Sequence, residues 1–155
     1  MKKTSTKFFL KKNRKPIQVL LMLGSLAGAA AINYTIVHNP LVFIMIATLF
    51  VHEIGHYLVA KYNKANPDYP YFIPLFPILL GVTRIKDLKD EHRSSVAIAG
   101  MIFASIFLLT MISYNFLFKI YSTFSLFIIL LLELVLNYIG SDGKKYRKYK
   151  KYSTV

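Results

Sequence analysis

The stretch FVHEIGHY, residues 50–57, decides how the rest of the chain is interpreted. It contains the pattern His-Glu-x-x-His, in which His52 and His56 are four residues apart. On a helix these two side chains project from the same face, one turn apart, so both imidazoles can reach one metal ion. Glu53 points beside that face, where a carboxylate can take a proton from a water at the metal and pass it to a leaving amine. The spacing therefore predicts a metal-dependent hydrolytic site.

The residues around this motif are apolar, which bears on the alternative explanation. In a soluble helix, two histidines on one face can simply be buried side chains that hydrogen-bond to their neighbours. Here the flanks are IATL at 46–49 and LVA at 58–60, which are typical of a membrane-spanning segment. Ionisable side chains are costly at membrane depth, so they mark a functional site by default. We therefore favour a metal site over structural histidines.

Composition and charge also indicate a membrane protein. The 155 residues are 55% hydrophobic, carry a formal net charge of +13 and include no cysteine. Without cysteine, this sequence has no disulfide, no thiolate metal site and no cysteine nucleophile. The positive charge is confined to the two ends and one loop, which fits anionic lipid headgroups better than nucleic acid. We expect the partner surface to be a lipid bilayer and expect no nucleic-acid partner.

Four apolar runs predict an all-α, polytopic membrane protein with about four transmembrane helices. Their lengths are close to what a bilayer requires, and they lie at 17–37, 41–62, 94–118 and 120–140. A basic tail, 1–16, precedes the first run, and a second basic tail, 144–155, follows the last. A cleavable signal peptide is the alternative for the N-terminal segment. The long basic stretch and the uninterrupted apolar run disfavour it.

The loop at 63–93 contains an apolar stretch, 71–85, with a different character. Pro74 and Pro77 interrupt this stretch, and it is too short to span a bilayer as a helix. We expect a re-entrant or extended segment, because irregular backbone at membrane depth is tolerated only against protein or a wet cavity. Such a segment can line the site, and its edge can pair with an extended substrate. The alternative is an apolar loop that lies on the membrane surface.

The positive residues predict an orientation. Nineteen of the twenty Lys and Arg residues fall in the two tails and in region 61–93, and only Lys119 falls elsewhere. The positive-inside rule then places both termini and the central loop in the cytoplasm. We expect the plasma membrane of a bacterial cell. In this arrangement the helices at 41–62 and 120–140 both run inward, so the histidines and Asp142 end at similar depth.

A catalytic zinc requires a third protein ligand, and Zn²⁺ suits two imidazoles in a tetrahedral site. Asp142 is our choice, because Gly140 and Gly143 flank it and let the backbone turn toward the bundle. The alternative for Asp142 is ordinary turn chemistry in Ser-Asp-Gly. Glu133 is the second candidate for the third ligand. Otherwise it can be protonated, hydrogen-bond to Asn137, or orient one of the metal ligands without binding the metal itself.

These features together resemble the site-2 proteases, the M50-type zinc intramembrane metalloproteases. The resemblance covers about residues 41–145 and rests on VHEIGH at 51–56, the FIP…G segment at 72–81, Ala99-Gly100, and Asn137 to Asp142-Gly143. It implies a three-helix metalloprotease core at 41–143, with 17–37 as an accessory helix. Three features depart from the family pattern. Met101 replaces its usual Pro, the prolines of its Asn…Asp-Gly motif are absent, and the spacing from Asn137 to Asp142 is shorter than usual.

The resemblance implies a zinc endopeptidase that hydrolyses peptide bonds in or near transmembrane segments of membrane proteins or signal-derived peptides. His52, His56 and Asp142 would hold the zinc, and Glu53 would act as general base. Asn137 would contact the substrate backbone or the oxyanion.

Two non-proteolytic alternatives remain from the sequence. One is a membrane protein that binds or transports metal, which would need polar residues along a path through the bundle. The predicted third helix offers only Ser105, Thr110 and Ser113. The other is a pseudoprotease that binds membrane segments without cutting them, which the intact Glu53 disfavours.

Overall fold

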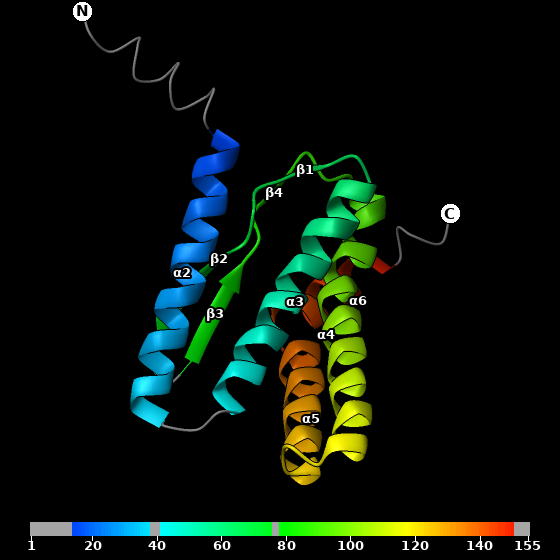
Figure 1. Cartoon of the computed structure of the whole chain (residues 1–155). Coiled ribbons are helices and arrows are strands. Elements are labelled where there is room, and N and C mark those ends of the chain that lie inside the picture. The colour runs from blue at the N-terminus through cyan, green and yellow to red at the C-terminus, as the bar shows by residue number, and fades with distance from the viewer. Residues whose placement is uncertain (1–13, 38–40, 76–77, 151–155) are drawn as a thin grey trace, which may run out of the picture.

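The computed structural model describes residues 14–37, 41–75 and 78–150, and most of them are helical (Figure 1). The helices are α2 (Arg14–Val37), α3 (Leu41–Tyr62), α4 (Asp90–Phe118), α5 (Thr123–Ile139) and α6 (Ser141–Tyr149). In the described part of the chain, short strands connect α3 to α4: β1 (Asn66–Pro67), β2 (Tyr71–Leu75), β3 (Ile78–Val82) and β4 (Ile85–Lys86). The predicted helical architecture with one extended loop is therefore confirmed.

Helices α3 and α4 pack side by side and form the centre of the fold (Figure 1). A Cβ atom at Gly55 would lie only 2.8 Å from the carbonyl oxygen of Ala99, so this glycine permits the close approach of the two helices. At the end of the bundle where α4 turns into α5, a buried apolar cluster joins α3, α4 and α5. It consists of Ile44, Leu108, Ile112 and Leu126.

The apolar stretch between α3 and α4 forms an antiparallel hairpin of β2 and β3. Tyr71 pairs with Val82 at its open end. The hairpin lies between α2 and α3 (Figure 1). The amide of Phe72 donates a hydrogen bond to Ser25 Oγ of α2 at 3.1 Å, and its buried ring lies 6.1 Å from that of Phe50 in α3. This hairpin is the predicted extended segment; Pro77 lies outside the described residues.

Two helices begin earlier than predicted. Helix α2 begins at Arg14 rather than at 17, and Pro16 is accommodated because a first-turn residue needs no N–H partner within the helix. Helix α4 begins at Asp90 rather than at 94. Its first turn carries Asp90 and Glu91, whose negative charges favour the positive end of the helix dipole. Charged residues at the edge of an apolar run can thus belong to the helix that follows.

The largest difference from the predicted elements is α6. Residues 141–149 were expected as a turn followed by a tail, yet they are helical. Asp142 lies in the first turn of this helix, and Arg147 and Lys148 lie in its last turn. Both placements complement the helix dipole. Most of the predicted N-terminal tail, and the end of the C-terminal one, lie outside the described residues.

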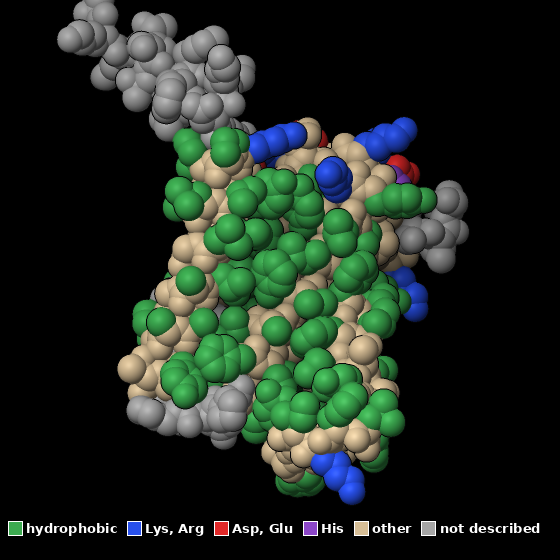
Figure 2. Space-filling view, viewed as in Figure 1, with side chains coloured by type: hydrophobic (Ala, Val, Ile, Leu, Met, Phe, Trp, Pro, Cys, Tyr) green, Lys and Arg blue, Asp and Glu red, His purple; other side chains and the backbone are tan. Residues whose placement is uncertain are grey.

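By length and composition, three described helices are able to cross a membrane: α2, α3 and α4. A fourth span is present if α5 and α6, which meet at a bend of 50°, are taken together. Hydrophobic side chains cover the middle of the face seen in Figure 2, and the Lys and Arg side chains lie along its margins. Exposed apolar surface of this extent is typical of an interaction surface, whether with lipid or with protein.

Candidate metal centre

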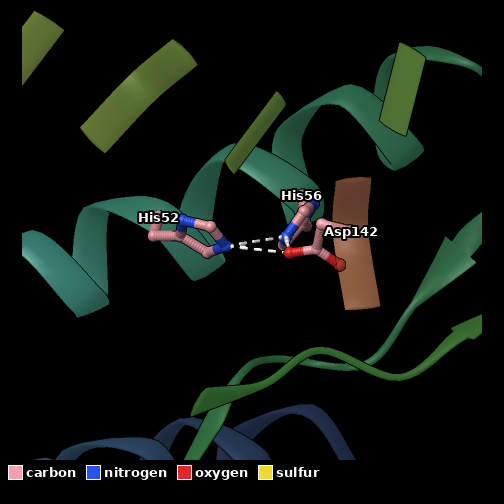
Figure 3. A group of neighbouring side chains, drawn as sticks. All are labelled: His52, His56 and Asp142. Carbon is pink, nitrogen blue, oxygen red and sulfur yellow. Dashed lines mark hydrogen bonds and ion pairs between the residues drawn. The ribbon is translucent and has the colours of Figure 1, made fainter. Parts of the chain in front are cut away.

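His52 and His56 of α3 meet Asp142 of α6 at one point (Figure 3). The two Nε2 atoms lie 3.1 Å apart, and Oδ2 of Asp142 lies 3.1 Å from each of them. All three residues are buried, with 3%, 8% and 8% of their surface exposed. Two imidazole nitrogens and one carboxylate oxygen in this arrangement can hold a single metal ion.

The hydrogen bond at Nδ1 of each imidazole determines which ring nitrogen is able to bind a metal. Nδ1 of His56 lies 2.7 Å from the carbonyl oxygen of Val96, which can only accept a hydrogen bond, so this Nδ1 carries the proton. Nδ1 of His52 lies 2.6 Å from Oε1 of Glu133, which accepts as a carboxylate. In these tautomers of the neutral rings both Nε2 atoms present lone pairs toward Asp142. Three converging lone pairs repel one another, and a cation between them relieves that repulsion.

The junction of α5 and α6 places Asp142 in the site. Helix α5 ends at Ile139 and is capped by Gly140, and α6 begins at Ser141 with a bend of 50°. A Cβ atom at Gly143 would overlap the backbone of Tyr138, so α6 starts in direct contact with the last turn of α5. The two glycines were expected to let the backbone turn, and the chain does bend here, although no described glycine has a positive φ. Gly143 is required for close approach instead.

Gly100 of α4 forms one wall of the site. A Cβ atom at this position would lie 2.6 Å from Nε2 of both His52 and His56. The glycine therefore leaves open the space between the ring nitrogens and α4.

The carboxylate of Glu53 is held by the end of the hairpin. Thr83 Oγ1 lies 2.6 Å from Glu53 Oε2 and 3.2 Å from the Glu53 carbonyl oxygen. A Cβ atom at Gly81 would lie 2.7 Å from Oε1, so β3 also packs directly on this side chain. Glu53 is only 6% exposed. The loop that follows α3 thus orients the predicted general base.

A cavity of about 640 Å³ connects these groups. Glu53, His56 and Asp142 line it together with Arg93 and Lys145. Lys145 Nζ lies 3.6 Å from Oδ1 of Asp142, the oxygen that does not face the histidines. A cavity of this size lies in the usual range for small-molecule and cofactor sites, roughly 300–1,000 Å³. It is large enough to hold water or a small ligand beside His56 and Asp142.

The remaining predicted residues have different placements. Glu133 contacts His52 at Nδ1, on the side away from the converging atoms, so it is positioned to orient that ligand. The side-chain amide of Asn137 donates to the backbone oxygen of Glu133 at 2.8 Å, and Asn137 does not line the cavity. The structure therefore does not bring Asn137 to the site, and its contact with substrate stays a prediction.

Two contributions to the site were not predicted. Thr83 lies 30 residues after Glu53 and belongs to no motif. Its only signal is that it ends the apolar run 71–82 with a hydroxyl side chain. Val96 contributes its backbone carbonyl, which no side-chain pattern reveals.

Substitution of Glu133 tests its role behind His52. In Glu133→Gln the hydrogen-bond acceptor remains but the negative charge is lost, so His52 becomes a weaker donor to the metal. We expect metal affinity to fall by roughly 10–100-fold, measured by competition with a chelator. Asn137→Ala is the control, because the hydrogen bond that its side chain makes within the described structure goes to the backbone of its own helix, and its metal affinity should equal that of the wild type. Unchanged affinity in Glu133→Gln would show that this carboxylate does not support the ligand.

Comparisons were made with family models, with curated proteins and with solved structures, and none of them matches this chain.

Proposed function

We propose that this chain is a zinc-dependent intramembrane endopeptidase. The observation that carries the proposal is the convergence of His52, His56 and Asp142. Two of these residues, His56 and Asp142, line the cavity that Glu53 also lines. Zinc is the metal we propose, because two imidazoles and one carboxylate leave a fourth tetrahedral position for water or substrate. A purely structural zinc site is closed by four protein ligands, whereas the described residues supply three.

Each side chain then has a defined task. His52, His56 and Asp142 would hold the ion, which when bound supplies a Lewis acid that polarises a carbonyl and lowers the pKa of water. Glu53 accepts a proton from the water whose oxygen bonds to the peptide carbonyl carbon. It then donates that proton to the amide nitrogen as the C–N bond breaks. Thr83 keeps the carboxylate in place through both proton transfers.

The hairpin has a strand edge that can pair with an extended substrate. A helical peptide hides its carbonyl groups in hydrogen bonds, so the cleaved segment must unwind. Strand β3 pairs with β2 on one side, and in the described structure its sheet contains no further strand. Gly81 of β3 lies against Glu53. A substrate strand that pairs with the second edge of β3 would therefore pass close to the general base.

We further propose that the apolar helices span a membrane with both termini in the cytoplasm. The length and composition of α2, α3, α4 and the α5–α6 pair support four spans. The placement of nineteen of the twenty cations in the tails and the central loop supports the orientation. The substrates we propose are transmembrane segments of membrane proteins or peptides derived from signal sequences.

The first test is the zinc content of purified protein, wild type beside Asp142→Ala. We expect about one zinc ion per wild-type chain. In the variant, zinc affinity should fall by more than roughly 10–100-fold, which is the usual effect of losing a group that only hydrogen-bonds to a metal ligand. Elemental analysis and chelator competition measure both quantities. Glu91→Ala is the control, because Glu91 is exposed and pairs only with Lys89 and His92 in the described structure.

The outcomes of this test separate the alternatives. Zinc that stays equally tight in Asp142→Ala would move the third ligand to Glu133 or to another residue. A folded wild-type protein that binds no zinc would contradict the peptidase proposal and favour a pseudoprotease. Zinc binding without cleavage of any transmembrane peptide would favour a protein that binds or transports metal.

A further inference from the structure

Helix α6 has two chemically distinct faces. Its inward face carries Asp142, which is buried, and Tyr146 and Tyr149, which are partly buried. Its exposed cations, together with the cation that directly follows the helix, form what we call the cationic face: Lys144, Lys145, Arg147, Lys148 and Lys150. A nine-residue helix therefore joins a predicted metal ligand to a concentrated positive surface.

Little negative charge within the protein compensates this face. Among the described residues, Lys145 has a carboxylate partner, Asp142, but no ion pair joins the other four cations to an acidic side chain. Arg147 donates to the carbonyl oxygen of Tyr138 at 2.9 Å. Lys148 and Lys150 lie over the rings of Tyr149 and Tyr146, at 5.2 and 5.7 Å from the ring centroids. The face is thus held in shape by tyrosines while its charge remains available to an external anion.

The position of α6 in the chain indicates which anion it meets. Helix α5 has 17 residues, so it is about 25 Å long, close to the roughly 30 Å of a hydrocarbon core. If the α5–α6 pair forms the fourth span, α5 crosses most of the hydrocarbon core, and α6, the polar end of the pair, lies at the level of the lipid headgroups. The tyrosines match this level, because their amphipathic rings are enriched at membrane interfaces. A soluble polyanion would reach only a face that headgroups already surround.

Helix α6 connects this face to the metal centre. Asp142 lies one turn before Tyr146 on the same helix. At the other end of α6, the Tyr149 ring packs against Arg93 of α4, with its hydroxyl 3.3 Å from Arg93 Nη1. A contact that holds the outward face of α6 in place also holds Asp142 beside His52 and His56.

We propose that the cationic face of α6 binds anionic lipid headgroups and that this contact keeps Asp142 in position at the metal centre. Negatively charged membrane would then raise metal affinity, and bound metal would in turn strengthen the contact of α6 with lipid, because the coupling is reciprocal. This inference rests on the membrane placement and the metal centre of the proposed function. It adds regulation of that site by the charge of the surrounding lipid.

The test compares zinc affinity in two lipid environments. The full chain is placed in nanodiscs of phosphatidylcholine alone or with phosphatidylglycerol, at about 0.15 M salt. Chelator competition gives the zinc affinity, and hydrogen exchange of the amides at 141–150 reports whether α6 is held. We expect zinc binding to be roughly tenfold tighter in the anionic discs, with slower exchange in α6.

Two triple variants of equal charge make the comparison specific. The α6 variant carries Lys144→Gln, Lys148→Gln and Lys150→Gln, which leaves Lys145 beside Asp142 and Arg147 on Tyr138 unchanged. The control carries Lys61→Gln, Lys64→Gln and Lys89→Gln, exposed positions near the end of α3 and the start of α4. Zinc also accumulates near any anionic surface, and this non-specific effect is the same for both variants. We expect the control to keep the tenfold lipid response and the α6 variant to lose most of it.

Each result has a defined meaning. Equal zinc affinity in the two lipids, or equal lipid responses in the two variants, would overturn this inference and leave the proposed metal centre intact. Absence of zinc binding in both lipids would overturn the metal centre and the inference with it. A single-stranded oligonucleotide that protects 141–150 in neutral discs as well as phosphatidylglycerol does would overturn the assignment to lipid.

Discussion

Glu53→Gln is expected to abolish peptide cleavage while the metal stays bound. The carboxamide has nearly the same shape as the carboxylate, and its oxygen can still accept the hydrogen bond from Thr83. It cannot accept a proton from water, so general acid–base catalysis is lost. We expect the cleavage rate to fall by roughly 10²–10⁴-fold. The measurement is single-turnover cleavage of a transmembrane peptide by the reconstituted protein.

The zinc content of the same preparation makes this result specific to proton transfer. Glu53 is not one of the three converging ligands, so about one zinc ion per chain should remain. Glu91→Gln, an exposed carboxylate changed in the same way, is the control and should cleave at the wild-type rate. Full activity in Glu53→Gln would remove Glu53 from the mechanism. Loss of zinc together with activity would instead make Glu53 part of the metal centre.

Gly100→Ala is expected to remove the metal. The added methyl group would lie 2.6 Å from both Nε2 atoms, well inside the 3.4–4 Å of ordinary contact. Neither imidazole can easily retreat, because Glu133 and the Val96 carbonyl hold their Nδ1 atoms from behind. The methyl group therefore blocks the ligand atoms themselves. We expect metal affinity to fall by more than about a hundredfold, measured by chelator competition.

Gly24→Ala is the matched control for this substitution. Gly24 is also a helical glycine, but a Cβ atom there would meet nothing within 4 Å. This variant should bind zinc like the wild type, and circular dichroism should show equal helicity in both variants. Wild-type zinc affinity in Gly100→Ala would mean that α4 does not approach the histidines as closely as the structure shows.

Features that depend on residues close together in the sequence were predictable. The four-residue spacing of His52 and His56 places them on one face of any helix, whatever surrounds that helix. The length of the apolar runs predicted α2 and α3 to within a few residues. Proline and the short length of the stretch 71–85 predicted extended structure between α3 and α4, where the β2–β3 hairpin lies.

The boundaries of α6 were not predictable in this way. Ser-Asp-Gly is ordinary turn chemistry, and the cations after it are typical of a solvated tail. The residues are helical in a setting where Gly143 fits against the backbone of Tyr138 and Tyr149 packs on Arg93. Both contacts depend on how α6 packs on α5 and α4, which local propensity does not describe.

The side chains of the candidate site were predictable from the sequence alone: two imidazoles on one helical face, a carboxylate beside them and apolar helices around them. How these side chains are arranged depends on the packing of the helices and strands. Asp142 is 90 residues from His52, and it reaches the ring nitrogens because α6 packs against α4. Thr83 and the Val96 carbonyl orient Glu53 and His56 across 30 and 40 residues of the chain. Helical periodicity acts over one turn, whereas these contacts follow from the packing of separate elements.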